Sequence, residues 1–286
     1  MVALRRVPSN IVDVMMPGAP YLRALHHPGG PSVVEVRQVS PEALDIRIMG
    51  HDPQIHVQTV ATMLGTEVDL QGWYERTKSL PWLERLANEL RGLKPPRYPK
   101  LWEALCHGII FQQLSIVAAA AIMQRFVERF SKPIAHDGVS LYPFPTADAI
   151  HRADGTLMQG LGLSRQKTTY LKNAAAAIVS RAITSEAIKL VSTDEAALKL
   201  RAITGIGRWT AANILLRGFG RLDVFPAGDS GVAQGIKTLS GNPNIDLEEI
   251  LEVLGDLRGM LYFHLLLGRL RGIHFREEHP SDAPAS

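Results

Sequence analysis

The chain has 286 residues, of which 46% are apolar, and its 31 basic and 28 acidic residues give a net charge of +3 and a pI near 9.0. These values predict a soluble globular protein with a sizeable core, and they permit a local basic face that binds nucleic acid. The single cysteine, Cys106, excludes an internal disulfide framework and any four-cysteine metal or iron–sulfur site made by one chain. No apolar run approaches the roughly 20 residues that span a bilayer, and no secretory signal opens the chain. We therefore expect an intracellular protein, located in the cytoplasm with the nucleoid or in the nucleus.

Residues 1–94 are predicted to form a small α+β domain. Two β-favouring segments, Val33–Val39 and Ala43–Met49, are separated by a short turn and predict a hairpin. A further short strand is expected around Tyr21–Leu25. Apolar residues then recur at helical spacing within 57–64 and 82–90, so helices are expected to cover the sheet.

The run Lys94–Lys100 is the best candidate for a domain boundary, because three prolines in seven residues discourage both helix and sheet. Residues 95–274 are predicted to form an all-helical domain, and 275–286 a flexible tail. The expected fold is therefore mostly α with a small N-terminal antiparallel sheet, and its helical part forms two subdomains around a DNA-binding cleft.

An interhelical turn is predicted between the helices at 101–111 and 116–130. Ser115 is a good N-cap for the second helix, so Gln113 and Leu114 are expected in the turn and not within one long rod. Such a turn could face a ligand.

A second feature of the helical domain is a glycine-punctuated turn between two helices within 194–219. Gly205 and Gly207 allow positive φ and close backbone approach, so the amides around them and around Trp209 can point outward together at the start of the second helix. This arrangement favours an anion, and most of all a phosphate.

A lone carboxylate follows that turn. Asp229 lies 22 positions after Gly207 (229 − 207), between Gly228 and a segment with helical spacing, and it is predicted to be the N-cap of a helix. The helix dipole would favour its ionised form.

These blocks resemble the helix–hairpin–helix DNA glycosylase superfamily. TGIGRWTAANILLRG followed by DVFPAGDSGV is similar to its hairpin, Gly/Pro-rich loop and catalytic aspartate, and IIFQQLSIVAAA upstream resembles the alkylbase, or 3-methyladenine II, branch. The resemblance covers about residues 95–272. It implies a glycosylase that acts as a monomer on damaged double-stranded DNA, needs no cofactor and has no membrane partner.

The resemblance also implies a role for each matching position. Asp229 matches the catalytic carboxylate, and the amides around Gly205, Gly207 and Trp209 match a grip on a DNA phosphate. Trp209 also matches an aromatic wall of the base pocket, with Gln113 beside it, and Leu114 matches the wedge that fills the gap left by the extruded base. The carbonyls that could hold a monovalent sodium or potassium ion are those of Arg201, Ile203 and Ile206.

The implied chemistry is hydrolysis of the N-glycosidic bond. Asp229 beside C1′ would stabilise the oxocarbenium character of the sugar and orient or deprotonate water. Cationic alkylated bases leave well and need no strong general acid. Lyase relatives carry a lysine nucleophile where this chain has Trp209, so Schiff-base chemistry and strand cleavage are not expected.

Two departures from the best-known members of the branch leave the substrate open. Asn213 and Leu257 stand where two further pocket aromatics are expected, and Trp102, Phe111 or Tyr262 could complete the cage. Two alternatives therefore remain: a glycosylase for deaminated or oxidised bases, and a non-enzymatic helix–hairpin–helix DNA-binding protein. The second has no use for Asp229.

The remaining polar residues on apolar helices have simpler interpretations. His107 and His264 are expected to be core histidines, and no cluster has metal-ligand spacing in the sequence. Four arginines could contact phosphates or form a solvated basic face. They are Arg217, Arg221, Arg269 and Arg271.

Overall fold

The computed structural model describes residues 5, 7–27, 29–50, 53–228, 230–242 and 244–273, excluding the side chains of 53–55 and 230. Its chain divides into two compact units, each built from two separate segments: 1–68 with 94–221, and 69–93 with 222–286. The predicted boundary near residue 94 is one of the points where the chain passes between units. The segment 69–93 nevertheless groups with the C-terminal helices, although the sequence placed it in the N-terminal domain.

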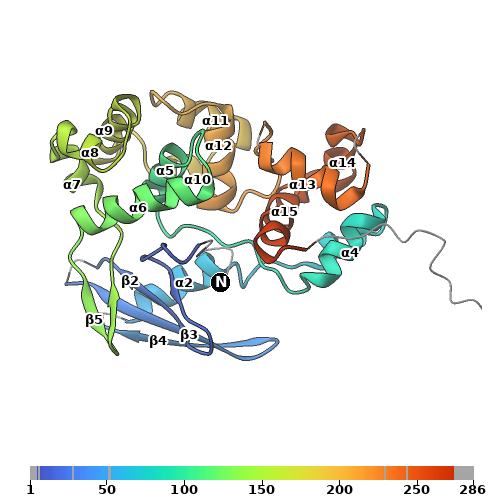
Figure 1. The fold of residues 1–286 in the computed structure, drawn as a ribbon, viewed down its shortest axis with the longest axis horizontal. Helices are drawn as coiled ribbons and strands as arrows, with labels where there is room; N and C mark the ends of the chain where they lie inside the picture. The colour runs from blue at the N-terminus through green and yellow to red at the C-terminus, as the bar shows by residue number, and fades with distance from the viewer. Residues whose placement is uncertain are drawn as a thin grey trace, which may run out of the picture. The chain divides into compact units, whose positions relative to one another are not determined.

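The first unit begins with a four-stranded antiparallel sheet in the order β1-β2-β3-β4 (Figure 1). The strands are β1 (Val14–Met15), β2 (Tyr21–Leu25), β3 (Ser32–Ser40) and β4 (Ala43–Met49). The predicted hairpin and the predicted short strand are both confirmed.

Alternation of side chains along β2 and β3 produces two apolar faces. On one face, Tyr21 and Val36 pack with Met63 of α2 (Pro53–Leu64). On the other face, Leu22 and Val33 pack with other residues of the first unit. A strand that is covered on both faces is buried at successive positions, which explains the buried start of β3.

The structure adds a small sheet that the all-helical prediction for 95–274 did not include. β5 (Ile134–His136) and β6 (Val139–Leu141) form an antiparallel hairpin, and Leu141 joins the second face of the N-terminal sheet. Asp137, at φ 45°, and Gly138, at φ 76°, form its two-residue turn. Both residues have the positive φ that such short hairpins require.

Helices make up the rest of the first unit. They are α5 (Leu101–Ile110), α6 (Ile116–Phe130), α7 (Ala147–Arg152), α8 (Gly155–Gly160), α9 (Arg165–Val179), α10 (Ser185–Lys189), α11 (Thr193–Arg201), α12 (Arg208–Ile214) and the π-helical η1 (Leu215–Phe219). The side chains of Ser115, Thr146 and Ser164 accept hydrogen bonds from backbone amides at the starts of α6, α7 and α9. Capping signals in the sequence thus set these helix starts.

The second unit is helical where it is described. It contains α3 (Gln71–Thr77), α4 (Pro81–Glu89), α13 (Ser230–Ser240), α14 (Leu247–Leu254), η2 (Gly255–Leu257) and α15 (Gly259–Arg271). Trp73 Nε1 donates to His264 Nε2 at 3.1 Å, and the Arg76 guanidinium contacts the Leu254 carbonyl. These contacts join the segment 69–93 to the C-terminal helices.

Candidate nucleic-acid interface

The turn between α11 and α12 has the form that the glycines predict. Gly205 has φ 96°, and Gly207 is the extended N-cap of α12, with φ −83° and ψ −177°. Among the described residues, no side chain caps α12, and a Cβ atom on Gly207 would meet no atom within 4 Å. The first amides of α12 are therefore open to an anion.

Gly205 is required by close packing as well as by its backbone conformation. A Cβ atom at this position would lie 2.1 Å from Cγ of Tyr170, which comes from α9. The Tyr170 hydroxyl in turn lies 2.5 Å from Gln166 Nε2. The hairpin thus rests directly on an aromatic ring of α9, and only glycine fits between them.

Trp209 lies in the first turn of α12 and is half-buried. Its Nε1 is enclosed, yet it has no hydrogen-bond partner within the described part of the chain. A buried indole N–H without an acceptor is unfavourable in the free protein. The role of Trp209 against a base stays a prediction.

The predicted interhelical turn is present between α5 and α6. Ser115 accepts from Ala118 N at 3.2 Å and begins α6, which confirms its capping role. Gln113 has φ 53°, in the left-handed region that is uncommon for residues other than glycine. Leu114 follows it and is 39% exposed, while Val117, in the first turn of α6, is 71% exposed. The segment Gln112–Ser115 is called the wedge turn below.

The wedge turn and the hairpin are hydrogen-bonded to each other. Gln112 Nε2 donates to the Gly205 carbonyl and lies within hydrogen-bond distance of Thr210 Oγ1, at 2.9 Å in each case. Gln112 was not singled out by the sequence. Only its position next to Gln113 could have suggested this contact.

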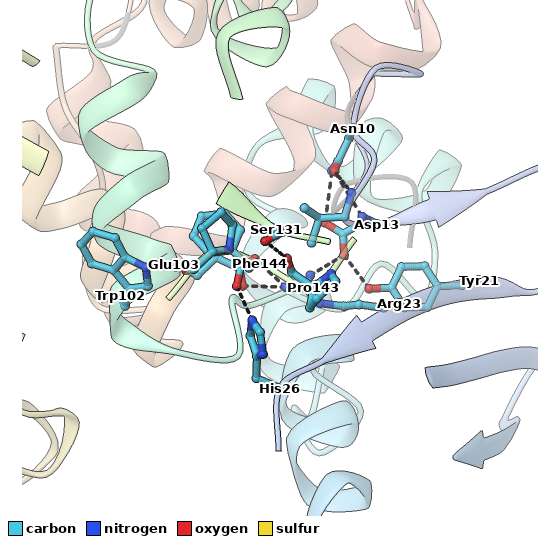
Figure 2. A network of polar contacts seen from close by, with 12 residues as sticks. Asn10, Asp13, Tyr21, Arg23, His26, Trp102, Glu103, Ser131, Pro143 and Phe144 are labelled. Atoms are coloured by element: carbon cyan, nitrogen blue, oxygen red, sulfur yellow. Dashed lines mark hydrogen bonds and ion pairs between the residues drawn. The ribbon is translucent and has the colours of Figure 1, made fainter. Parts of the chain in front are cut away.

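A buried ionic network ties the start of α5 to the N-terminal sheet (Figure 2). Arg23 Nη1 donates to Asp13 Oδ1 at 2.5 Å, and Arg23 Nη2 contacts both oxygens of Glu103 at 2.6 Å. Asp13 also accepts from Tyr21 Oη at 2.6 Å and from Asn10 Nδ2 at 3.1 Å. The network thereby fixes the base of the helix whose other end leads into the wedge turn.

The pKa values in this network follow from burial and pairing. Burial raises the pKa of Glu103 in spite of Arg23. Burial acts in the same direction on Asp13, but Arg23 and hydrogen bonds from Tyr21 and Asn10 outweigh it and lower the pKa of Asp13. The two carboxylates hold the pKa of Arg23 well above its usual value, although burial opposes them. Arg23 therefore stays charged at the centre.

Two of the four arginines considered for phosphate contacts are used inside the first unit. Arg217 is fully buried, with its guanidinium carbon 4.6 Å from the centre of the Tyr98 ring. Arg221 donates to Thr193 Oγ1 and to the carbonyls of Ile188 and Val191. Neither matches the interpretation as a solvated face or as a free phosphate contact.

The expectation of core histidines is confirmed in both units. His107 stacks on Tyr98 at 4.2 Å between ring centres, and also on Phe111 and Phe144. His264 Nδ1 lies 2.9 Å from the Met260 carbonyl, and burial lowers the pKa of His264 to about 4. His264 is therefore neutral at pH 7.

The aromatic residues that could complete a base pocket differ in exposure. Trp102 is buried and donates from Nε1 to the Pro145 carbonyl at 2.8 Å, so it supports the fold. Phe111 is half-buried and lines an apolar hollow with Val7 and Met123. Asn213 is buried, and it presents no ring where the resemblance expected one.

The other predicted site residues are placed as follows. Arg201 ends α11, and the Ile203 carbonyl accepts from Ile206 N at 3.0 Å in the hairpin. Carbonyl oxygens at a helix end are hard oxygen ligands, which suit an alkali cation. Asp229 lies outside the described residues.

Three potential metal ligands that are distant in sequence meet in the first unit. Ligand atoms of Glu35, His136 and Asp137 lie within 4.8 Å of one another. No spacing in the sequence predicts this cluster, because the hairpin of β5 and β6 brings the residues together. Arg37 Nε donates to Glu35 Oε1 at 2.7 Å, so the charge of this carboxylate is already balanced by Arg37.

Every helix in the described part of the chain is too short or too polar to span a bilayer.

Comparison with known proteins identifies relatives of this arrangement. Residues 106–256, more than half of the chain, match the family described as HhH-GPD superfamily base excision DNA repair protein. A DNA-3-methyladenine glycosylase of Bacillus subtilis (strain 168) is 32% identical over 186 residues, which are 65% of this chain and 61% of that protein. The match thus covers less than two thirds of the length of this relative.

Two solved structures extend the comparison. The 3-methyladenine DNA-glycosylase from Archaeoglobus fulgidus has a TM-score of 0.79 at 26% identity, over 95% of this chain and 93% of that chain. A Schizosaccharomyces pombe 3-methyladenine DNA glycosylase (Mag1) in complex with abasic DNA has a TM-score of 0.56 at 27% identity, over 68% and 96%.

Proposed function

Because the chain belongs to the HhH-GPD superfamily of base-excision DNA repair proteins, as the resemblance predicted, we propose that it is a monofunctional DNA glycosylase. Its substrates are alkylated purines of the 3-methyladenine and 7-methylguanine type in duplex DNA, and its product is an abasic site. The names of its relatives support this choice. The observation that carries the proposal is the pairing of an uncapped helix N-terminus at Gly207 with an exposed leucine on a hydrogen-bonded neighbouring turn.

In this proposal the hairpin holds the DNA backbone. The first amides of α12 and the positive end of its dipole bind one phosphate, and the bare Gly207 lets the strand approach. A cation on the carbonyls of Arg201, Ile203 and Ile206 would draw the phosphate closer. The partner is damaged duplex DNA, bound by a monomer.

The wedge turn then stabilises the extruded state. Unstacking a base costs a few kcal/mol, and Leu114 offsets part of that cost by filling the vacated space. Trp209, which is half-buried at the start of α12, offers a ring face to the flipped base. An electron-deficient alkylated purine stacks well on such a ring.

Asp229 carries the chemistry in this proposal. Its carboxylate stabilises positive charge on the sugar and orients water for attack at C1′. Trp209 occupies the position of the lyase lysine, so the enzyme hydrolyses the bond without cutting the strand.

The test is base release by the wild type and by Asp229→Asn. The asparagine variant is expected to keep its affinity for lesion DNA within a few-fold and to lose release, because the amide cannot neutralise the developing charge. Release is measured on duplexes that hold 3-methyladenine, 7-methylguanine, hypoxanthine or uracil. Unchanged release by the variant would refute the assignment of Asp229.

The same duplexes separate the alternatives. A glycosylase for deaminated bases is favoured by the absence of a ring at Asn213, and it would act on hypoxanthine or uracil in preference to the alkylated purines. Binding without release from any of the four duplexes would favour a glycosylase for oxidised bases or a non-enzymatic DNA-binding protein.

A further inference from the structure

Lys167 holds the end of α5 from a neighbouring helix. It lies in the first turns of α9, and its Nζ donates to the carbonyls of Ile110 and Gln112 at 2.7 Å each. The Ile110 carbonyl belongs to the last turn of α5, and the Gln112 carbonyl belongs to the wedge turn that follows it. Carbonyls at the end of a helix lack intrahelical partners and favour a nearby positive charge. Among the described residues, Lys167 has no carboxylate partner in the structure. The hydrogen bonds of its ammonium group therefore go to the backbone carbonyls of Ile110 and Gln112.

Gln112 continues the connection from α5 to the hairpin. The backbone oxygen of Gln112 receives Lys167, while its side-chain Nε2 reaches the Gly205 carbonyl and Thr210 Oγ1 at 2.9 Å. One residue thus joins α9 to the hairpin. Nearby, Gly108 lets α5 approach α12 so closely that an added Cβ atom would lie 2.9 Å from Thr210 Cγ2.

The wedge turn needs such support. Gln113 is in the left-handed region at φ 53°, which strains the backbone of a residue that has a side chain. Leu114 is 39% exposed, so part of its apolar surface stays in water in the free protein. A turn with a strained residue and a partly exposed apolar side chain would relax if its flanking contacts were removed.

We propose that Lys167 and Gln112 are positioning residues that lock the wedge turn to the hairpin, so that Leu114 and the phosphate-binding amides meet DNA at a fixed separation. The inference rests on the proposed function for the meaning of the wedge. Neither residue touches the reacting atoms. With the lock in place, Leu114 enters the gap without the cost of ordering the turn on binding.

The test compares Lys167→Met with a matched control, Lys172→Met. Lys172 lies on the same helix, and its Nζ donates to the Ala153 carbonyl at the end of α7, away from the wedge turn. Both changes keep an unbranched side chain and remove one helix-capping ammonium. Affinity is measured for an undamaged duplex and for one with a tetrahydrofuran abasic-site analogue, and their ratio reports wedge insertion without catalysis.

Lys167→Met is expected to lower the preference for the abasic-site duplex by about tenfold, the scale of a lost hydrogen bond to a charged group, and to leave affinity for undamaged DNA within about twofold. Lys172→Met should leave the preference unchanged, and Lys167→Arg should restore most of it. Gln112→Met should reproduce the effect, and it decides the test if Lys167→Met does not fold.

Equal effects of Lys167→Met and Lys172→Met would overturn the inference, as would an equal loss of affinity for both duplexes caused by Lys167→Met. The proposed function fails separately. If the wild type releases no base from any lesion duplex while Lys167→Met still loses the preference for the abasic-site duplex, the enzyme assignment is wrong but the positioning role of Lys167 is supported. If the wild type releases bases and Lys167→Met has the same preference for the abasic-site duplex as Lys172→Met, only the positioning role of Lys167 is wrong.

Discussion

Replacing Gly205 with alanine tests whether the hairpin rests on α9 as closely as the structure shows. Alanine at φ 96° costs about 1–2 kcal/mol, because its Cβ crowds the backbone in this region. The same Cβ would lie 2.1–2.5 Å from three ring atoms of Tyr170, and such overpacking costs about 1–3 kcal/mol. We expect Gly205→Ala to lose about 2–5 kcal/mol of unfolding free energy.

Urea unfolding of a small set of variants separates the two contributions. In the background of Tyr170→Ala the ring is gone, so Gly205→Ala should cost only the backbone contribution of about 1–2 kcal/mol. Gly207→Ala is the control. Its φ is −83°, and no atom of the described residues lies within 4 Å of the added Cβ, so the free energy of unfolding should stay within about 0.5 kcal/mol. If Gly205→Ala cost the same with and without Tyr170, the inferred contact between hairpin and ring would be incorrect.

Two further predictions concern buried charge. Arg23→Met leaves the carboxylates of Asp13 and Glu103 buried without their cation, so we expect a loss of about 3–5 kcal/mol at pH 8. Without Arg23 the folded-state pKa values of Asp13 and Glu103 rise, so the loss of unfolding free energy should be smaller at pH 5 than at pH 8. Adding Glu103→Gln should also reduce the loss. A loss that does not depend on pH would contradict this reasoning. Burial lowers the pKa of His264 to about 4, so the buried neutral ring makes its full contribution to the free energy of unfolding above pH 6.5. That free energy should fall by about 3 kcal/mol as the pH drops to 4, because the unfolded chain takes up the proton first. His264→Gln should flatten the dependence of urea midpoint on pH in that window, and equal slopes would count against the buried neutral histidine.

Local signals in the sequence predicted much of the fold. Alternating β-favouring residues located β3 and β4, because one residue in two must face each side of a sheet. Ser115 located the wedge turn, because its hydroxyl is the first acceptor for the amides of α6. Both signals act over a few residues, which is why one sequence suffices to read them.

Contacts between distant segments could not be read in this way. The role of Lys167 depends on carbonyls 55 and 57 residues away, to which no local sequence pattern connects it. Arg217 was grouped with surface arginines, since charge alone does not reveal that the Tyr98 ring covers it. The strands β5 and β6 have three residues each and too little periodicity to detect. The family resemblance supplied Asp229, whose geometry lies outside the described residues.

The two-segment composition of the second unit has a consequence for biosynthesis. Trp73 bonds to a histidine 191 positions later, and Arg76 to a carbonyl 178 positions later. At a translation rate of about 5–20 residues per second, on the order of ten seconds or more pass between synthesis of the segment 69–93 and synthesis of its partners. During that interval α3 and α4 pack only on each other within the second unit and lack the C-terminal helices that cover them in the folded unit, so we expect a chaperone to bind the nascent chain at this segment.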